Sequence, residues 1–115
     1  MRLKRPRVHD DAHLQFVRNL PCVSCANDTA TEAAHLRAGS MKYGKRETGG
    51  GEKPSDCWTL PLCGRCHRMQ HKGHELGFWN TRGINPFALA LALDKASGDH
   101  ELGCQIVRAW SREYA

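Results

Sequence analysis

The sequence predicts a small, single-domain α+β fold with a thin hydrophobic core, on three observations. Two C-x-x-C pairs, Cys22/Cys25 and Cys63/Cys66, enclose a region with two short strand candidates. Helical patterns stand before and after this region. Only 40% of the 115 residues are apolar, and 11 are Gly and 5 are Pro. Hydrophobic burial alone is therefore expected to stabilise the chain weakly.

One helix and two strands are expected in the first part of the chain. The helix lies within residues 10–20, with Asp10 or Asp11 as its N-cap. Short strands are expected at 31–37 and 57–62. The stretch between the strands is rich in Gly and basic residues and has no periodicity. A loop of this length in a small domain either counts against the assignment of the neighbouring elements or is a functional segment.

Further helices are expected in the second part of the chain. The chain should turn helical after Cys66, while the stretch that begins at His74 is ambiguous. Asn85 as N-cap and Gly98 as a stop define one helix, and Asp99 can cap a last one. The stripe of the last helix that should face the core consists of Leu102, Ile106, Trp110 and Tyr114.

The expected organisation is one domain over residues 1–115. It comprises a basic arm (1–9), a metal-binding core (10–73) and C-terminal helices (74–115). No apolar run approaches the roughly 18 residues of a membrane span. The basic N-terminus also lacks the apolar run of a secretory signal. We therefore expect a cytoplasmic protein with no membrane partner.

The cysteines point to metal rather than to disulfides, because a reducing compartment keeps thiols free. The three-residue step of each C-x-x-C pair lets a tight turn aim both sulfurs at one point. Four thiolates at about 2.3 Å complete a tetrahedral zinc shell. The expected structural zinc ligands are Cys22, Cys25, Cys63 and Cys66. The alternative is a set of buried thiols or a redox pair, and Cys57 and Cys104 have no partner at such spacing.

Histidines outside this set suggest a second site. His67 and His71 lie at i and i+4 on a helix, so both imidazoles can share a second cation. His35, in the first strand candidate, comes close to them if the strands form a hairpin against that helix. A neutral imidazole can accept a proton from water, and a metal ion offsets charge on a phosphate. Two alternatives stay open: a structural role for His35, and a zinc shell completed by the pair with one cysteine unused.

Three segments together resemble the HNH endonuclease superfamily: the first C-x-x-C, "AHLR", and "SDCWTLPLCGRCHRMQH". They are most similar to small phage and prophage HNH nucleases, including the recombination-enhancement (Ref) type. The resemblance is strongest over residues 22–71. It implies a zinc-stapled ββα-metal (treble-clef) core with flanking N- and C-terminal helices. It also implies a metal-dependent DNA endonuclease that leaves 5′-phosphate and 3′-hydroxyl ends, in phage or prophage recombination or DNA processing.

The resemblance also implies residue roles. His35 matches the histidine that activates the attacking water. His67 and His71 match the ligands of the catalytic divalent ion, which is Mg²⁺ or Mn²⁺, with Zn²⁺ as an alternative. The four cysteines match those that many members use for structural zinc.

Two positions depart from the family pattern. Ala34 stands where most members have a His or Asp ligand just before the base. The middle asparagine of the motif falls near Trp58 or Cys57, and neither can replace it chemically. The nearest polar residue is Asp56, which is expected to ligate the metal or to orient His35.

The net charge of +5 favours an anionic partner, nucleic acid first, although ordinary solubility accounts for it equally well. Basic side chains near the Gly-rich loop and the metal helix are candidate contacts to DNA phosphates. These are Arg37, Lys42, Lys45, Arg46, Lys53, Arg65 and Arg68. The alternative is a loop that is merely solvated. Expected partners are DNA and a recombinase or other phage DNA-processing protein.

A rival function is a non-catalytic zinc module that binds nucleic acid or a protein. Ala34 and the missing asparagine favour the rival. The His67/His71 pair, which is redundant beside four cysteines, favours the enzyme.

Overall fold

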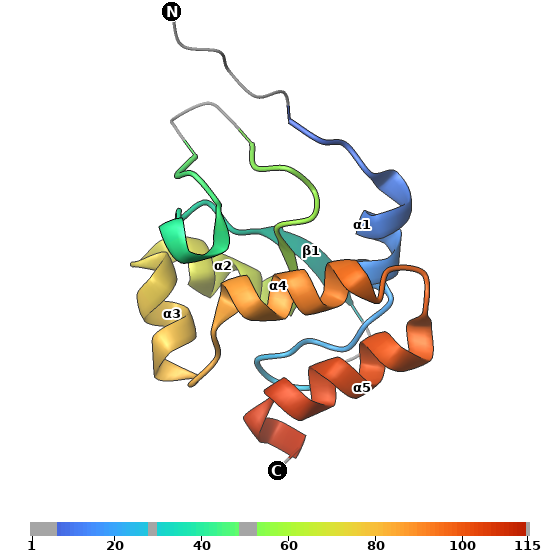
Figure 1. Ribbon diagram of the computed structural model, residues 1–115. Coiled ribbons are helices and arrows are strands. Elements are labelled where there is room, and N and C mark those ends of the chain that lie inside the picture. The colour runs from blue at the N-terminus through green and yellow to red at the C-terminus, as the bar shows by residue number, and fades with distance from the viewer. Residues whose placement is uncertain (1–6, 28–29, 49–52, 115) are drawn as a thin grey trace, which may run out of the picture.

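The computed structural model describes residues 7–27, 30–48 and 53–114. In these ranges, five α-helices and two short 3₁₀ helices surround a two-stranded hairpin (Figure 1). The helices are α1 (Asp11–Arg18), α2 (Gly64–Lys72), α3 (Glu75–Thr81), α4 (Pro86–Lys95) and α5 (His100–Trp110). The strands are β1 (Thr31–His35) and β2 (Thr59–Cys63), and the 3₁₀ helices are η1 (Met41–Tyr43) and η2 (Arg112–Tyr114). The α+β class is confirmed.

The hairpin positions the candidate site. β1 and β2 are antiparallel, with Thr31 opposite Cys63 and His35 opposite Thr59. Successive strand residues alternate between the two faces of a sheet. Glu32 and His35, three residues apart, therefore project from opposite faces. β2 runs without a break into α2, so the hairpin fixes where that helix begins.

The core lies between the hairpin and the helices. α4 runs across the hairpin, α5 lies beneath α4, and α1 lies on the opposite side from α3 (Figure 1). The largest fully buried side chains include Trp79, Leu20, Leu36, Leu60, Leu62, Leu89 and Leu93. Trp79 Nε1 donates to Gln70 Oε1 over 2.9 Å, which joins α3 to α2.

The expected caps are confirmed, and one helix begins earlier than expected. Asp10, Asn85 and Asp99 accept backbone N–H groups at the starts of α1, α4 and α5. α2 begins at Gly64 rather than after Cys66, because the helix continues directly from β2. The ambiguous stretch is α3, which the side chain of His74 caps.

The last helix buries the expected face only in part: Ile106 and Trp110 are half-buried against the core, but the fully buried residues are others. Gly103 and Val107 are buried, whereas Leu102 is 41% exposed. The reason is close packing of α5 on α1: a Cβ at position 103 would lie only 2.7 Å from the ring of Phe16. Tyr114 lies beyond the end of α5.

The beginning of the described chain is bonded to the loop before β2. Arg7 Nη2 lies 2.7 Å from Asp56 Oδ1, and the Asp56 N–H donates to the Val8 carbonyl over 3.0 Å. Arg7 and Val8 are thus held in place, although the sequence predicted a loose arm there. Residues 1–6 of that arm lie outside the described residues. Across the described ranges, every helix is too short or too polar to cross a bilayer.

Candidate metal centre and histidine sites

A four-cysteine cluster joins the turn after α1 to the start of α2. The sulfurs of Cys22, Cys25, Cys63 and Cys66 all lie within 4.8 Å of one another. Cys25 Sγ and Cys63 Sγ are 3.7 Å apart. Tetrahedral zinc with Zn–S bonds of about 2.3 Å separates its sulfurs by about 3.8 Å. The cluster is therefore compatible with a structural zinc ion, and Cys57 and Cys104 stand outside it.

The backbone shapes the turn that carries the first cysteine pair. The Cys22 N–H donates to the Asn27 carbonyl, and the Ala26 N–H donates to the Cys22 carbonyl, both over 2.8 Å. Ala26 has a φ of 67°, in the left-handed region that L-residues rarely occupy. Val23 N–H donates to the Pro61 carbonyl of β2. The turn is thus strained at one residue and anchored to the hairpin.

Hydrogen bonds favour the thiolate at Cys63, whereas burial raises the pKa of Cys66. Burial by itself raises the pKa of the Cys63 thiol, but hydrogen bonds from the Cys66 backbone and the neighbouring thiols lower that pKa to about 7. Burial raises the pKa of Cys22 to about 12. The Arg65 side chain hydrogen-bonds Cys25, which raises the pKa of the guanidinium. Arg65 thus places a positive charge beside the sulfurs.

A histidine pair lies farther along α2. His67 Nε2 and His71 Nε2 are 3.0 Å apart, and His67 Nδ1 lies 2.8 Å from Glu32 Oε1. Two imidazole nitrogens that share one ion at about 2.1 Å lie about 3.0–3.4 Å apart. Burial and the neighbouring His67 lower the pKa of His71, which favours the neutral form that binds metal. The pair has the geometry of two ligands to one cation.

Glu32 is a site residue that sequence reasoning missed. Ligating histidines usually donate their other ring N–H to a carboxylate, which fixes the tautomer and the ring orientation. Glu32 stands in that relation to His67. No local pattern in the sequence pointed to it, because the contact depends on the hairpin register, which pairs Glu32 with Leu62, two residues before α2 begins.

His35 forms a separate group with Asp56. His35 Nε2 lies 3.0 Å from Asp56 Oδ1, and Asp56 Oδ2 accepts the Asp10 N–H over 2.7 Å. Asp56 is 1% exposed, and burial by itself raises its pKa. Hydrogen bonds from Asp10, His35 and Arg7 outweigh burial and lower the pKa to about 2, so the carboxylate is ionised at neutral pH.

The tautomer of His35 follows from this contact. Burial lowers the pKa of His35, although Asp56 opposes the shift. A neutral imidazole next to an ionised carboxylate donates its Nε2–H to that carboxylate. Nδ1 then keeps its lone pair as a proton acceptor. Asp56 thus contacts His35, and Arg7, which sequence reasoning missed, contacts the same carboxylate.

The structure does not bring His35 to the histidine pair. Within the described ranges, the four cysteines are the only group of three or more His, Cys, Asp or Glu side chains whose ligand atoms lie within 4.8 Å of one another. His35 stands three residues, about 10 Å, along β1 from Glu32 and on the opposite face. Ala34 is fully buried. The pair therefore gains no third ligand from β1.

The candidate DNA contacts divide into two kinds. Lys45 is only 6% exposed, and its Nζ donates to the carbonyls of Arg37 and Arg46 over 3.3 Å each. Burial also lowers the pKa of Lys45. Lys45 therefore holds the loop together. The exposed candidates are Lys42, Arg46, Lys53, Arg65 and Arg68, and Arg37 is half-buried.

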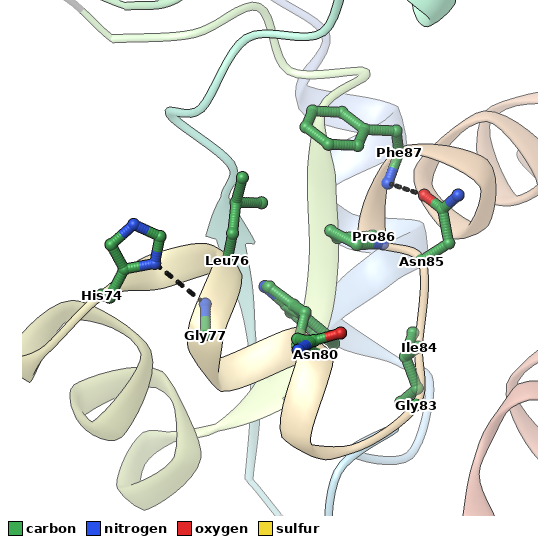
Figure 2. Close-up of a pocket in the computed structure, with 10 residues that line it drawn as sticks. His74, Leu76, Gly77, Asn80, Gly83, Ile84, Asn85, Pro86 and Phe87 are labelled. Carbon is green, nitrogen blue, oxygen red and sulfur yellow. Dashed lines mark hydrogen bonds between the residues drawn. The ribbon is translucent and has the colours of Figure 1, made fainter.

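Two cavities border α3. One, of about 360 Å³, lies where the segment after β1 meets the end of α2, and it is lined by Arg37, Gln70 and His71 among others. The other, of about 650 Å³, lies between α3 and the start of α4 (Figure 2). His74 and Leu76 line both.

The hairpin, the surrounding helices and the cysteine cluster define a small α+β protein with a candidate structural zinc site. The chain belongs to the family described as "Protein of unknown function (DUF968)", whose model matches residues 1–98. That match covers everything from α1 through α4 and ends before α5. No curated protein and no solved structure matches the chain. The activity is therefore inferred from the chemistry of the site.

Proposed function

We propose that the protein is a metal-dependent DNA endonuclease of the HNH type, built on a ββα-metal (treble-clef) core. The observation that carries the proposal is the 3.0 Å separation of His67 Nε2 and His71 Nε2, on the helix whose start lies beside the cysteine cluster. Four thiolates saturate a tetrahedral ion. Both imidazoles are therefore available to a second, different cation.

Two groups of residues have distinct roles in this proposal. His35 Nδ1 accepts a proton from water, while Asp56 holds Nε2–H and stabilises the imidazolium that forms. His67 and His71 hold a divalent ion, which supplies positive charge that stabilises the phosphate and its leaving oxygen. Water and phosphate oxygens are the remaining ligands that Mg²⁺ or Mn²⁺ accepts readily. Because His35 lies on the opposite face of the hairpin from Glu32 and the pair, the role of His35 as base and the role of the pair as ion ligands need separate tests.

DNA as the substrate is supported by charge. The chain carries a net charge of +5, and five of its candidate phosphate contacts are exposed. Such contacts add affinity without reading the base sequence. A role in phage or prophage recombination or DNA processing, with a recombinase or similar partner, rests on the resemblance to small HNH nucleases.

Nicking of supercoiled plasmid tests the proposal. Wild-type protein should nick with Mg²⁺ or Mn²⁺ and not with EDTA. His35→Ala should lose about a hundredfold in rate or more, the usual scale for a general base. His100→Ala, an exposed histidine on α5, is the matched control and should keep the wild-type rate. Equal rates for His35→Ala and wild type would remove the assigned base.

A second candidate function is a non-catalytic zinc module that binds nucleic acid or a protein. The observation that favours it is the Asp56 network, which joins Arg7, Asp10 and His35 and so also acts as a clamp on the beginning of the described chain. Metal stoichiometry separates the two candidates. One tightly held zinc supports the module, whereas zinc plus an exchangeable second ion supports the enzyme.

A further inference from the structure

Residues 7–10, the N-terminal segment, are bonded to the loop before β2. Arg7 Nε donates to the Pro54 carbonyl over 2.9 Å, and the Val8 N–H donates to Ser55 Oγ over 3.0 Å. Each of these contacts joins residues that are 47 positions apart in the sequence. The N-terminal segment is therefore held against this loop rather than extending freely into solvent.

The N-terminal segment and β1 meet on one buried carboxylate. Asp56 Oδ1 accepts a hydrogen bond from Arg7 Nη2 over 2.7 Å and lies 3.0 Å from His35 Nε2. Asp56 Oδ2 accepts the Asp10 N–H over 2.7 Å. Both oxygens are thus engaged, so the carboxylate cannot rotate without breaking one of these bonds. Arg7 therefore helps to fix the orientation in which Asp56 is presented to His35.

Arg7 also places a positive charge near His35. Arg7 Nη2 and His35 Nε2 each lie within 3.0 Å of the same oxygen. The two nitrogens are therefore at most about 6 Å apart, where one unit charge still acts appreciably on another near a protein surface. Burial lowers the pKa of His35 most, and Asp56 opposes that shift. The charges of Arg7 and Lys53 lower the pKa further. His35 takes a proton from water only in its neutral form, so these charges keep it available as a base near neutral pH.

We propose that Arg7 is a positioning residue of the candidate catalytic site. Its guanidinium holds the Asp56 carboxylate in place for His35 Nε2, and its charge opposes protonation of His35 until the ring takes a proton from the attacking water. This inference rests on the proposed nuclease function and adds the N-terminal segment to the site. The sequence alone assigns this segment to a loose basic arm.

Proton NMR titration of the His35 ring tests the proposal directly. Zinc-loaded protein is used without DNA and without an added divalent ion, and the His35 signal is identified by its loss in His35→Ala. We expect Arg7→Met to raise the titration midpoint by about 0.5–1 pH unit, the effect of removing one unit charge at this distance near a surface. Arg7→Lys keeps the charge and should stay within about 0.3 pH unit of wild type.

Three further variants show whether the shift is specific. Arg7→Gln removes the charge but keeps an N–H donor, so it should give the same shift as Arg7→Met and serves in its place if that variant does not melt cooperatively. Lys53→Met removes the weaker of the two charges and should raise the midpoint by less. Arg108→Met, at an exposed position on α5, should leave the titration of His35 unchanged. An unchanged midpoint in the neutral Arg7 variants, or an equal shift in Arg108→Met, would overturn the proposal.

The pH dependence of plasmid nicking shows whether this effect reaches catalysis. A higher pKa of the base moves the acidic side of the pH–rate profile to higher pH. Arg7→Met should therefore lose up to about tenfold on the acidic side and little on the plateau. A loss of equal size at every pH would mean a purely structural role and would overturn the positioning role. Wild-type protein that does not nick would remove the nuclease, while the NMR titration would still decide whether Arg7 acts on His35.

Discussion

The cysteine cluster and the histidine pair share one helix but are built differently. The cluster draws four sulfurs from two distant segments, and three of its cysteines are buried. The pair has two imidazoles from adjacent turns of α2, with one carboxylate behind His67. Structural zinc sites are closed, whereas catalytic metal sites keep open positions. Under the proposed function, the start of α2 serves stability and its later turns hold the second ion.

The first and largest test of this comparison is Cys63→Ser. Structural zinc contributes about 10–16 kcal/mol in small peptides, which matches or exceeds the stability of a whole domain. We expect the variant to be unfolded by far-UV circular dichroism. His67→Ala, on the same helix but in the other region, is the control and should melt cooperatively. A normal melting curve for Cys63→Ser would contradict the structural role of the cluster.

The second test measures how acid changes the stability that Asp56 contributes, which depends on neither the cysteine cluster nor the histidine pair. Its pKa is lowered from 3.8 to about 2, so its stabilisation is complete above pH 3.8 and is lost as the pH falls toward 2. A shift of that size corresponds to about 2 kcal/mol. The stability gap between wild type and Asp56→Asn should therefore shrink by about 2 kcal/mol from pH 6 to pH 2. Chemical denaturation at each pH measures the gap.

Zinc release in acid destabilises wild type and Asp56→Asn alike, so the gap is compared only at pH values at which both proteins still unfold cooperatively with zinc bound, and about 2 kcal/mol is its limit near pH 2. The lowered pKa of His35 has the same sign and adds a loss of stability that begins below its unfolded value of 6.5. A gap that stays constant across this pH range would mean that the Asp56 network contributes no pH-dependent stability.

The third test concerns the pair His67 and His71, which the proposed function makes a metal site with open positions. Glu32→Gln removes the carboxylate that orients His67, and such partners typically change metal affinity by about 10–100-fold. We expect Mn²⁺ to bind at least about tenfold more weakly by calorimetric titration, while the cysteine-bound zinc content stays the same. Glu101→Gln, an exposed carboxylate on α5, makes the same charge change and should leave Mn²⁺ binding intact. Equal effects of the two variants would show that Glu32 acts only through its charge.

The smallest expected effect concerns backbone strain in the turn that carries the first cysteine pair of the cluster. Ala26 is held at a φ of 67°, where a non-glycine residue pays about 1–2 kcal/mol. Glycine relieves this strain, but it also raises the conformational entropy of the unfolded chain, which lowers stability by about 0.4–1 kcal/mol. We expect Ala26→Gly to stabilise the protein by about 0.5–1 kcal/mol in urea denaturation. Ala12→Gly, at an exposed position within α1, should destabilise it by about 1 kcal/mol.

The parts of the fold that depend on short-range chemistry could be predicted from sequence. The C-x-x-C pairs, the caps at Asp10, Asn85 and Asp99, and the two strand positions are local patterns, and the structure contains them. These features require only spacing, turn chemistry and residue type. The approach of Asp56 to His35 was also expected, but from the resemblance rather than from a local pattern.

Features that depend on register and packing could not be predicted in this way. The contact between Glu32 and His67 requires the strand pairing, which no local pattern specifies. The full burial of Gly103 and Val107 on α5 was not predicted, because it depends on the close approach of the helix to Phe16 that Gly103 allows. Lys45 was expected on the surface, but neighbouring carbonyls capture its ammonium group. Each depends on residues that are distant in the sequence or on backbone carbonyls, which are the same at every position of a sequence.

The continuity of β2 with α2 has a consequence for insertions and deletions. Each residue turns an α-helix by about 100°. A single residue inserted between Cys66 and His67 would leave the sulfurs in place and rotate both imidazoles away from Glu32. The spacing between the two sites therefore sets the direction in which both imidazoles point, and this turn of α2 cannot take an insertion without losing the contact to Glu32.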